Sequence, residues 1–163
     1  FDVWTVHVVS FVGPEHSHMG TPIVKGDLVL AASGETREDI GKCAAYLGED
    51  EPRLGGDALR LSLKDGDAVY MSFLLNSPGV VAEKVKLCKG EIIVHIYPSM
   101  LKRIFLPVPP PDEQKAIGRW LMGKVENERS AIKAAHAQIA KLKEYRSILI
   151  NAAVTGKIKV PEV

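Results

Sequence analysis

One uninterrupted amphipathic segment near the end of the sequence restricts the possible folds. Three consecutive prolines precede Asp112, and no proline or glycine occurs between Lys124 and Thr155. Proline fixes φ and has no amide donor, so it stops the preceding element. Asp112 can cap a first helical turn, and Gly156 can end the helix in the left-handed conformation. We therefore predict one helix over residues 112–156 and a tail over 157–163. A helix of about 40 residues is about 60 Å long, which suits a strut or a docking surface.

The predicted helix carries the heptad pattern of a coiled coil. One seam position holds Val125, Ile132, Ile139, Arg146 and Ala153, and the other holds Leu121, Glu128, Ala135, Leu142 and Leu149. The apolar members form a seam for a partner helix, which the charged Glu128 and Arg146 interrupt. The residues that we expect to pair are Leu121, Val125, Ile132, Ala135, Ile139, Leu142 and Leu149. The alternative is a helix that packs only on its own domain. Because the sequence holds no second long helix to cover the seam, we expect the partner helix to come from another chain or from a part of the protein absent here.

Residues 1–111 alternate between short apolar runs and polar turns. Runs rich in branched and aromatic residues predict strands at 3–12, 28–32, 42–47, 59–63 and 92–96. Residues 67–76 predict a helix that buries Tyr70, Phe73 and Leu74, and Pro78 with Gly79 is expected to end it. The predicted fold class is therefore α+β: a small mixed α/β domain over 1–111, incomplete at its N-terminus, followed by one long coiled-coil-forming helix.

The composition suits one ordinary domain. With 163 residues and 46% apolar content, the chain can bury its own core. It contains neither a run of eighteen apolar residues nor a charged-then-apolar leader, so we expect a cytoplasmic protein without a membrane partner. The two cysteines, Cys43 and Cys88, are expected to be reduced thiols.

The charge is distributed unevenly along the sequence. Residues 1–111 hold 11 Lys/Arg and 14 Asp/Glu, whereas residues 112–163 hold 10 and 6. A protein that grips DNA alone normally carries a basic face, because phosphate neutralisation supplies most nonspecific affinity. The first 111 residues show no such excess, which counts against DNA binding by this domain alone.

No catalytic signature is found. The sequence lacks G-x-G-x-x-G, a P-loop, G-x-S-x-G and the tetrad of adenine methyltransferases, so we predict a non-catalytic chain without a cofactor. His7, His16 and His18 could be imagined as zinc ligands, but no third ligand of known geometry accompanies the His-x-His pair, and no metal site is predicted. Cys43 has no paired base and is expected to be a core residue.

Three strings near the end of the chain occur in a specific order and spacing. They are IFLPVPPPDEQKAI at 104–117, IAKLKEYRSILI at 139–150 and AVTGKI at 153–158. Together they resemble the conserved region of type I restriction–modification specificity subunits (HsdS). Upstream, KGDLVL at 25–30, SG at 33–34, IGK at 40–42 and LLNS at 74–77 are similar to stretches of that family's target recognition domains. The resemblance covers roughly residues 20–160.

The resemblance implies a DNA sequence-specificity subunit that performs no chemistry itself. In that family two halves pack their long helices antiparallel, and each domain reads half of a bipartite target in double-stranded DNA. The subunit docks methyltransferase (modification) subunits and, through them, the restriction subunit. The second half would come from the same chain, with this sequence as the C-terminal half, or from a homodimer that reads a palindromic site. The alternative, favoured by the acidic balance, is a coiled-coil protein–protein adaptor without DNA recognition.

Polar loops between the predicted strands are where base-reading side chains would lie. Ser, Thr and Arg donate to base edges, and glycine lets the backbone approach closely. The resemblance points to regions rather than side chains, and each of these residues has a solvated turn as its alternative interpretation. The candidates are Ser33, Gly34, Thr36, Arg37 and Lys42 in the first loop, Arg53, Gly55 and Gly56 in the second, and Lys89, His95 and Tyr97 in the third.

Overall fold

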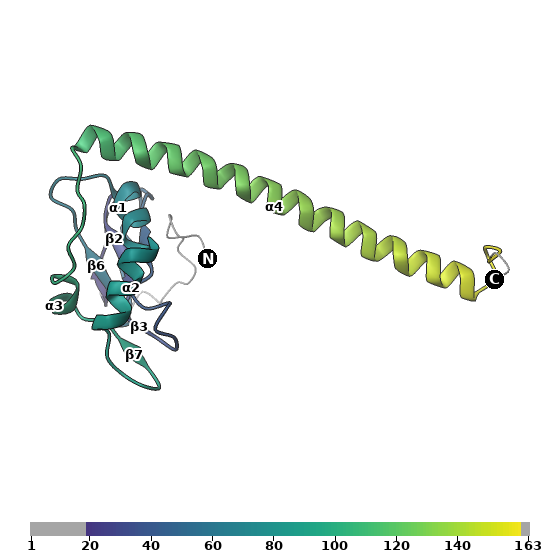
Figure 1. The fold of residues 1–163 in the computed structure, drawn as a ribbon, viewed down its shortest axis with the longest axis horizontal. Helices are drawn as coiled ribbons and strands as arrows, with labels where there is room; N and C mark the ends of the chain where they lie inside the picture. The colour runs from purple at the N-terminus through teal and green to yellow at the C-terminus, as the bar shows by residue number, and fades with distance from the viewer. Residues whose placement is uncertain (1–18, 161–163) are drawn as a thin grey trace. The chain divides into compact units, whose positions relative to one another are not determined.

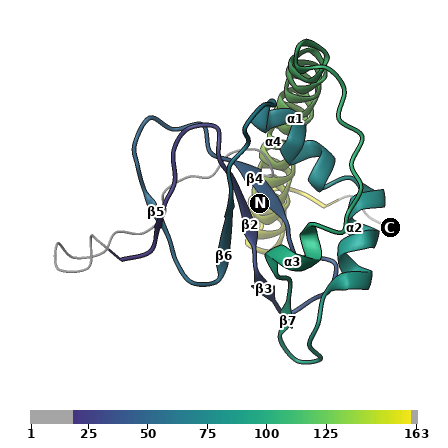
Figure 2. The same ribbon diagram turned by 90° about the vertical axis from the view of Figure 1, so that its left-hand side faces the viewer.

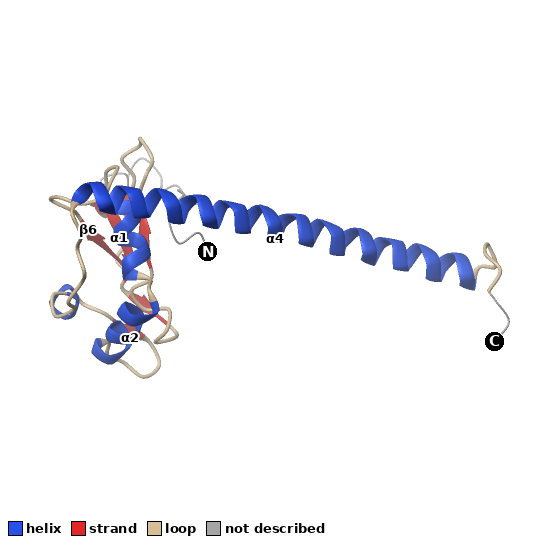
Figure 3. Ribbon diagram, turned by 45° about the horizontal axis from the view of Figure 1, so that its top comes forward, coloured by secondary structure: helices blue, strands red, loops and turns tan. Residues whose placement is uncertain are grey.

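The computed structural model describes residues 19–160, and the chain divides into two compact units, residues 1–120 and 121–163. The strand expected at 3–12 and the three histidines at 7, 16 and 18 lie outside the described residues. The first unit combines small sheets with short helices, and one long helix begins in it and continues through the second unit (Figure 1, Figure 3). This is the α+β class that the sequence predicts.

A three-stranded antiparallel sheet in the order β4-β2-β6 forms the centre of the first unit. The central strand β2 (Leu28–Ala31) pairs with β4 (Cys43–Ala45) on one side and β6 (Ala58–Leu61) on the other. Leu28 and Leu30 are buried, because alternate side chains of a strand point to the same face. The three strands confirm the strands predicted from these apolar runs, each in a shorter form.

Three short helices accompany this sheet. α1 (Ala68–Leu75) begins after Asp67, whose carboxylate accepts a bond from the Tyr70 amide at 2.8 Å and so caps the helix. α2 (Pro78–Leu87) and α3 (Pro98–Leu101) each begin with a proline. The predicted helix over 67–76 does end before Pro78, but this proline also starts a second helix, which the sequence does not predict. Proline is tolerated at the first helical position, where its missing amide would have no partner.

Within residues 19–160, the buried core consists of two clusters. The larger one packs Leu28, Leu30 and Cys43 of the sheet against side chains of α1, including Tyr70 and Leu75. The smaller one contains Ile40, Cys88, Val94 and Ile96. The two cysteines are thus free, buried and in separate clusters.

Two further sheets have only two strands each (Figure 2). β1 (Thr21–Pro22) pairs with β5 (Arg53–Leu54), and β3 (Ser33–Gly34) pairs with β7 (Val94–His95). The sequence predicts loops at Ser33, Gly34 and Arg53, and the structure corrects this. A strand of two residues is too short to show an alternating pattern, so only tertiary pairing reveals it.

The long helix α4 (Pro111–Val154) has 44 residues. It begins one residue earlier than predicted, so Asp112 lies in the first turn with Glu113 and not at the N-cap. Both carboxylates still favour this end, where the helix dipole is positive. At the other end Gly156 has φ of +71°, and the Lys157 amide donates to Ala152 O at 2.8 Å, which confirms the predicted glycine stop.

Candidate nucleic-acid interface

The structure brings the first and third predicted loops together. β3 and β7 set Ser33 opposite His95 and Gly34 opposite Val94 in an antiparallel pair. Some sixty residues separate these strands in the sequence, so their meeting is a product of the fold. Candidates from both loops therefore lie at one end of the first unit, where Figure 2 shows β3 beside β7.

A tight hairpin projects from this end, formed by residues 89–95. The backbone amides of Lys89 and His95 each donate to the other's carbonyl, at 2.9 and 2.7 Å. Gly90 has φ of +112°, and a Cβ placed on it would lie 2.0 Å from Ile93 O, so this turn requires glycine. The tip carries Ile92, 87% exposed, and Ile93, 55% exposed. The sequence predicts both isoleucines in a strand over 92–96, but the strand contains only Val94 and His95.

Arg37 holds the base of the 89–95 hairpin. Its Nη2 donates to Gly90 O at 2.9 Å, and its Nη1 lies 3.5 Å from Cys88 Sγ. The planar guanidinium thus bridges the first loop and the hairpin through two nitrogens. The sequence suggests Arg37 as a base-reading residue, and the structure gives it a positioning contact.

Lys42 and Thr36 converge on one carboxylate. The Lys42 ammonium lies 2.5 Å from Asp39 Oδ1, and Thr36 Oγ1 donates to Asp39 Oδ2 at 2.7 Å. The bond from Lys42 has the larger effect and the bond from Thr36 the smaller, and together they hold the pKa of Asp39 below its usual value. The loop 33–42 contains three acidic and two basic residues. Its cations therefore do not form the basic footprint expected of a phosphate-gripping surface.

His95 at the end of the hairpin and Tyr97 just after it form an aromatic pair. Their ring centroids are 6.2 Å apart and their planes are 20° from parallel. Tyr97 is 50% exposed, and Lys89 at the start of the hairpin is also exposed. An exposed aromatic face, an imidazole and an ammonium can stack on or donate to nucleobases.

The second predicted loop is anchored elsewhere. Arg53 belongs to β5, and its Nη1 donates to Gly20 O at 3.0 Å. Gly55 and Gly56 are exposed and have open space around them, so a close backbone approach by another molecule is sterically allowed. One contact connects this loop to the first, since Ser33 Oγ donates to Asp57 Oδ1 at 2.9 Å.

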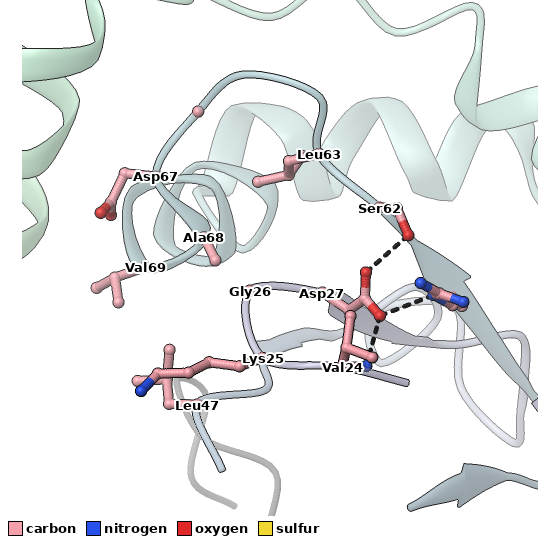
Figure 4. Close-up of a pocket in the computed structure, with 12 residues that line it drawn as sticks. Val24, Lys25, Gly26, Asp27, Leu47, Ser62, Leu63, Asp67, Ala68 and Val69 are labelled. Carbon is pink, nitrogen blue, oxygen red and sulfur yellow. Dashed lines mark hydrogen bonds and ion pairs between the residues drawn. The ribbon is translucent and has the colours of Figure 1, made fainter. Parts of the chain in front are cut away.

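A cavity of 460 Å³ lies between the turn before β2 and the start of α1 (Figure 4). Its most buried acidic group is Asp27, which accepts bonds from Val24 N, Ser62 Oγ and Arg60 Nε at 2.7–2.8 Å. Burial alone would raise the pKa of Asp27, but the three donors outweigh it and hold the pKa below its usual value. Asp27 therefore fastens β6 to the β2 turn and is not poised as a general acid.

Neither a family model nor a curated protein matches this sequence. A solved structure does. The chain shares its fold with a protein chain from a structural study of complex assembly and conformational transition of the type I R-M system. The TM-score is 0.58 and the two sequences are 18% identical. The match covers 81% of this chain but only 31% of that one, so this sequence spans about a third of the neighbour's length.

The seam residues predicted for helix pairing lie on α4. Leu121 and Val125 come early in the second unit, and Ala135 is exposed further along. Four large apolar members of the seam are between 40% and 67% exposed, namely Ile132, Ile139, Leu142 and Leu149. An apolar stripe of this length, even one interrupted at Glu128 and Arg146, is unusual on a surface that meets only water.

Two kinds of feature are absent from the part of the chain that the structure describes. Between residues 19 and 160, no group of three or more His, Cys, Asp or Glu side chains is placed to hold a metal ion. Within the same range, no helix combines the length and the apolar character that crossing a bilayer demands.

Proposed function

We propose that this chain is a DNA-specificity component of a type I restriction–modification complex. The observation that carries the proposal is the structural likeness to a chain of that system over 81% of this sequence. The strings at 104–117, 139–150 and 153–158, which resemble the specificity subunit, support the same assignment. In this role residues 1–111 read one half of a bipartite target, and the helix and tail over 112–163 join the halves and dock the methyltransferase subunits.

The proposed reading element is the 89–95 hairpin with its aromatic neighbours. Ile92 and Ile93 at the tip suit the methyl group of thymine, which is the apolar feature of the major groove. Lys89, His95 and Tyr97 supply donors and a stacking face beside it. Because Arg37 fixes the hairpin base, the tip is held in place before DNA arrives.

The acidic balance of residues 1–111 fits this role only within a complex. Without an excess of cations, this domain cannot draw its affinity from phosphates. The methyltransferase subunits would then enclose the duplex while this chain distinguishes base edges. The same acidic balance favours the second candidate, a coiled-coil adaptor whose first unit binds protein.

The test uses the chain assembled with a type I methyltransferase subunit, with methylated adenines mapped across a genome. Replacing Ile92 and Ile93 with serine should change or abolish the methylated sequence while the complex still assembles. Phe105→Ser removes a highly exposed apolar side chain outside the hairpin and should leave the recognised sequence unchanged. An unaltered methylation pattern in the hairpin variant would remove the hairpin from the reading surface. A folded chain that forms no complex at all would favour the adaptor.

Arg37 provides a second variant of the same test. Arg37→Lys keeps the positive charge but loses the fork that reaches Gly90 O and Cys88 Sγ together. If Arg37 acts by positioning the hairpin, lysine and alanine should impair target selection to a similar degree. If it acts as a charge on a phosphate, lysine should retain most of the activity.

A further inference from the structure

The Lys and Arg side chains of residues 19–111 fall into two groups. Most of them are already bound within the protein, to carboxylates in Lys25, Lys42, Arg60 and Lys86 and to backbone carbonyls in Arg37, Arg53 and Lys84. The other group is exposed, and its side chains make no hydrogen bond or ion pair within residues 19–160: Lys64, Lys89, Lys102 and Arg103. Cations of this second group can meet an anionic partner without giving up a bond in the protein.

Three of these four cations lie around the reading hairpin. Lys89 begins the 89–95 hairpin, Lys102 follows α3 directly, and the Arg103 amide donates to Met100 O at 3.0 Å. Met100 also packs against the smaller core cluster, to which the hairpin contributes Val94. The end of α3 and the hairpin are therefore neighbours in one small structural unit, and Figure 2 shows α3 next to β7.

The segment that carries these three cations is positive, although residues 1–111 as a whole are acidic. Residues 88–111 hold 3 Lys/Arg and 1 Asp/Glu, whereas residues 1–87 hold 8 and 13. The one acidic side chain is Glu91, which is exposed in the hairpin. The neighbouring loop 33–42 has three acidic and two basic residues, so the positive excess is confined to the hairpin and α3. Lys64, the fourth unpaired cation, lies beside Asp65 in the sequence.

We propose that Lys89, Lys102 and Arg103 contact DNA phosphates and so place the sugar–phosphate backbone beside the 89–95 hairpin. The inference rests on the proposed function and adds which side chains position the duplex. Exposed cations that no carboxylate holds can replace the counterions of phosphates at little cost. Arg103 can also bind one phosphate through two nitrogens of its planar fork.

The hairpin tip needs such an anchor. Ile92 and Ile93 can pack on a thymine methyl group, but their side chains can neither bind phosphate nor donate a hydrogen bond to a base edge. Phosphate contacts fix the register and orientation of a protein on the duplex, whereas base contacts specify the sequence. Three phosphate contacts are too few to hold DNA alone, so they agree with a domain whose affinity comes mainly from partner subunits.

The experiment measures DNA binding by the complex with a type I methyltransferase subunit at several salt concentrations. One duplex carries the sequence that the original complex methylates, and a second of equal length carries it scrambled. Replacing Lys102 and Arg103 with glutamine should weaken binding to both duplexes by the same factor. The plot of log affinity against log salt should become shallower by about 2, at roughly 0.9 per phosphate. Between about 50 and 200 mM salt, the original complex should then lose on the order of tenfold more affinity than the variant.

Three comparisons separate phosphate binding from other effects. Replacing Lys25 and Lys64 with glutamine removes two exposed positive charges outside the proposed group and should leave the salt dependence unchanged. Lys102→Arg keeps the charge and should keep the salt dependence as well. The serine variant of Ile92 and Ile93 should change the methylated sequence but not the salt dependence on the scrambled duplex, whereas the glutamine variant of Lys102 and Arg103 should do the reverse.

The inference and the proposed function fail in different ways. An unchanged salt dependence in the glutamine variant of Lys102 and Arg103 would overturn the inference, as would an equal change in the variant of Lys25 and Lys64. A loss confined to the target duplex would also overturn it, because the two side chains would then read bases. An original complex that methylates no defined sequence would refute the proposed function, while the salt dependence would still test the phosphate contacts. A folded chain that forms no complex would refute both.

Discussion

At the scale of single residues, Lys84 is a fully buried ionisable group in the described core. It is fully buried on α2, and its Nζ donates to Gly41 O at 2.6 Å. Gly41 has φ of +66°, and a Cβ placed on it would lie 2.8 Å from Lys84 Cδ, so the glycine makes room for this side chain. Burial lowers the pKa of Lys84 to about 8, from an ordinary value of 10.5.

This lowered pKa predicts a pH dependence of stability. Because the unfolded chain keeps the Lys84 proton up to about pH 10.5 and the folded chain loses it near pH 8, the unfolded state binds more protons between these values. The free energy of unfolding should therefore rise with pH through this window, by on the order of 3 kcal/mol from this group. Lys84→Met should flatten the rise, as measured by urea unfolding at pH 7 and pH 10.

The matched control for this experiment is Lys86→Met, which removes an exposed lysine from the same helix. It should leave the pH dependence of unfolding as it is in the original chain. If the free energy of unfolding of Lys84→Met rises with pH as steeply as that of the original chain, the buried lysine keeps its ordinary affinity for protons in the folded protein.

At the scale of elements, the start of α4 is joined to the start of α1 by one side chain. Gln114 is buried, its Oε1 accepts a bond from the Asp67 amide at 3.0 Å, and its Nε2 donates to Pro109 O at 2.7 Å. Gly118 lies one turn further on, where a Cβ would come 2.9 Å from Asp67 Oδ1. The proline-rich segment before α4 is anchored as well, because Tyr70 Oη donates a hydrogen bond to Pro107 O at 2.9 Å.

Gln114→Ala should destabilise the first unit through this junction. It leaves the Asp67 amide and the Pro109 carbonyl without their partner in a buried place, which should lower the free energy of unfolding by about 2 kcal/mol. Chemical denaturation followed by tyrosine or tryptophan fluorescence measures this loss of unfolding free energy. Gln138→Ala makes the same change on an exposed part of α4 and should be close to neutral. Equal effects of the two variants would contradict the proposed junction.

The elements differ in how far the sequence predicts them. The sequence correctly predicts the long or strongly patterned segments, which are α1, the three strands of the central sheet, and α4 with its Gly156 stop. These depend on local periodicity and capping, which the sequence displays directly. The sequence does not predict α2, because Pro78 can either stop a helix or start one and the local sequence does not distinguish the two.

The candidate interface is harder to predict because it depends on non-local contacts. The polar residues around 33–42 and 89–97 indicate the right regions, yet nothing local shows that Ser33 pairs with His95. The partners of Arg37, on a segment some fifty residues away, are equally invisible in sequence. Ile92 and Ile93 resemble strand residues because exposed and buried isoleucines look alike in a short apolar run.

At the scale of the whole molecule, the proposed function makes α4 a spacer between two reading units, paired with the helix of a second specificity half. Removing residues 134–140 deletes one complete heptad, so the remaining seam residues stay on one face of the helix. The helix then becomes about 10 Å shorter, at 1.5 Å per residue. About three base pairs of B-DNA have this length, at roughly 34 Å for ten.

This deletion therefore yields a prediction that rests on the proposed function. Mapped methylation should show the same half-sites separated by a gap about three base pairs shorter, with the complex still assembled. Removing only residues 136–137 turns the two parts of the seam by about 200° relative to one another, at 3.6 residues per turn, and should abolish helix pairing. An unchanged gap in a heptad-deleted chain that still assembles would show that α4 does not set the spacing. A changed half-site would instead mean that the deletion disturbs the reading unit itself.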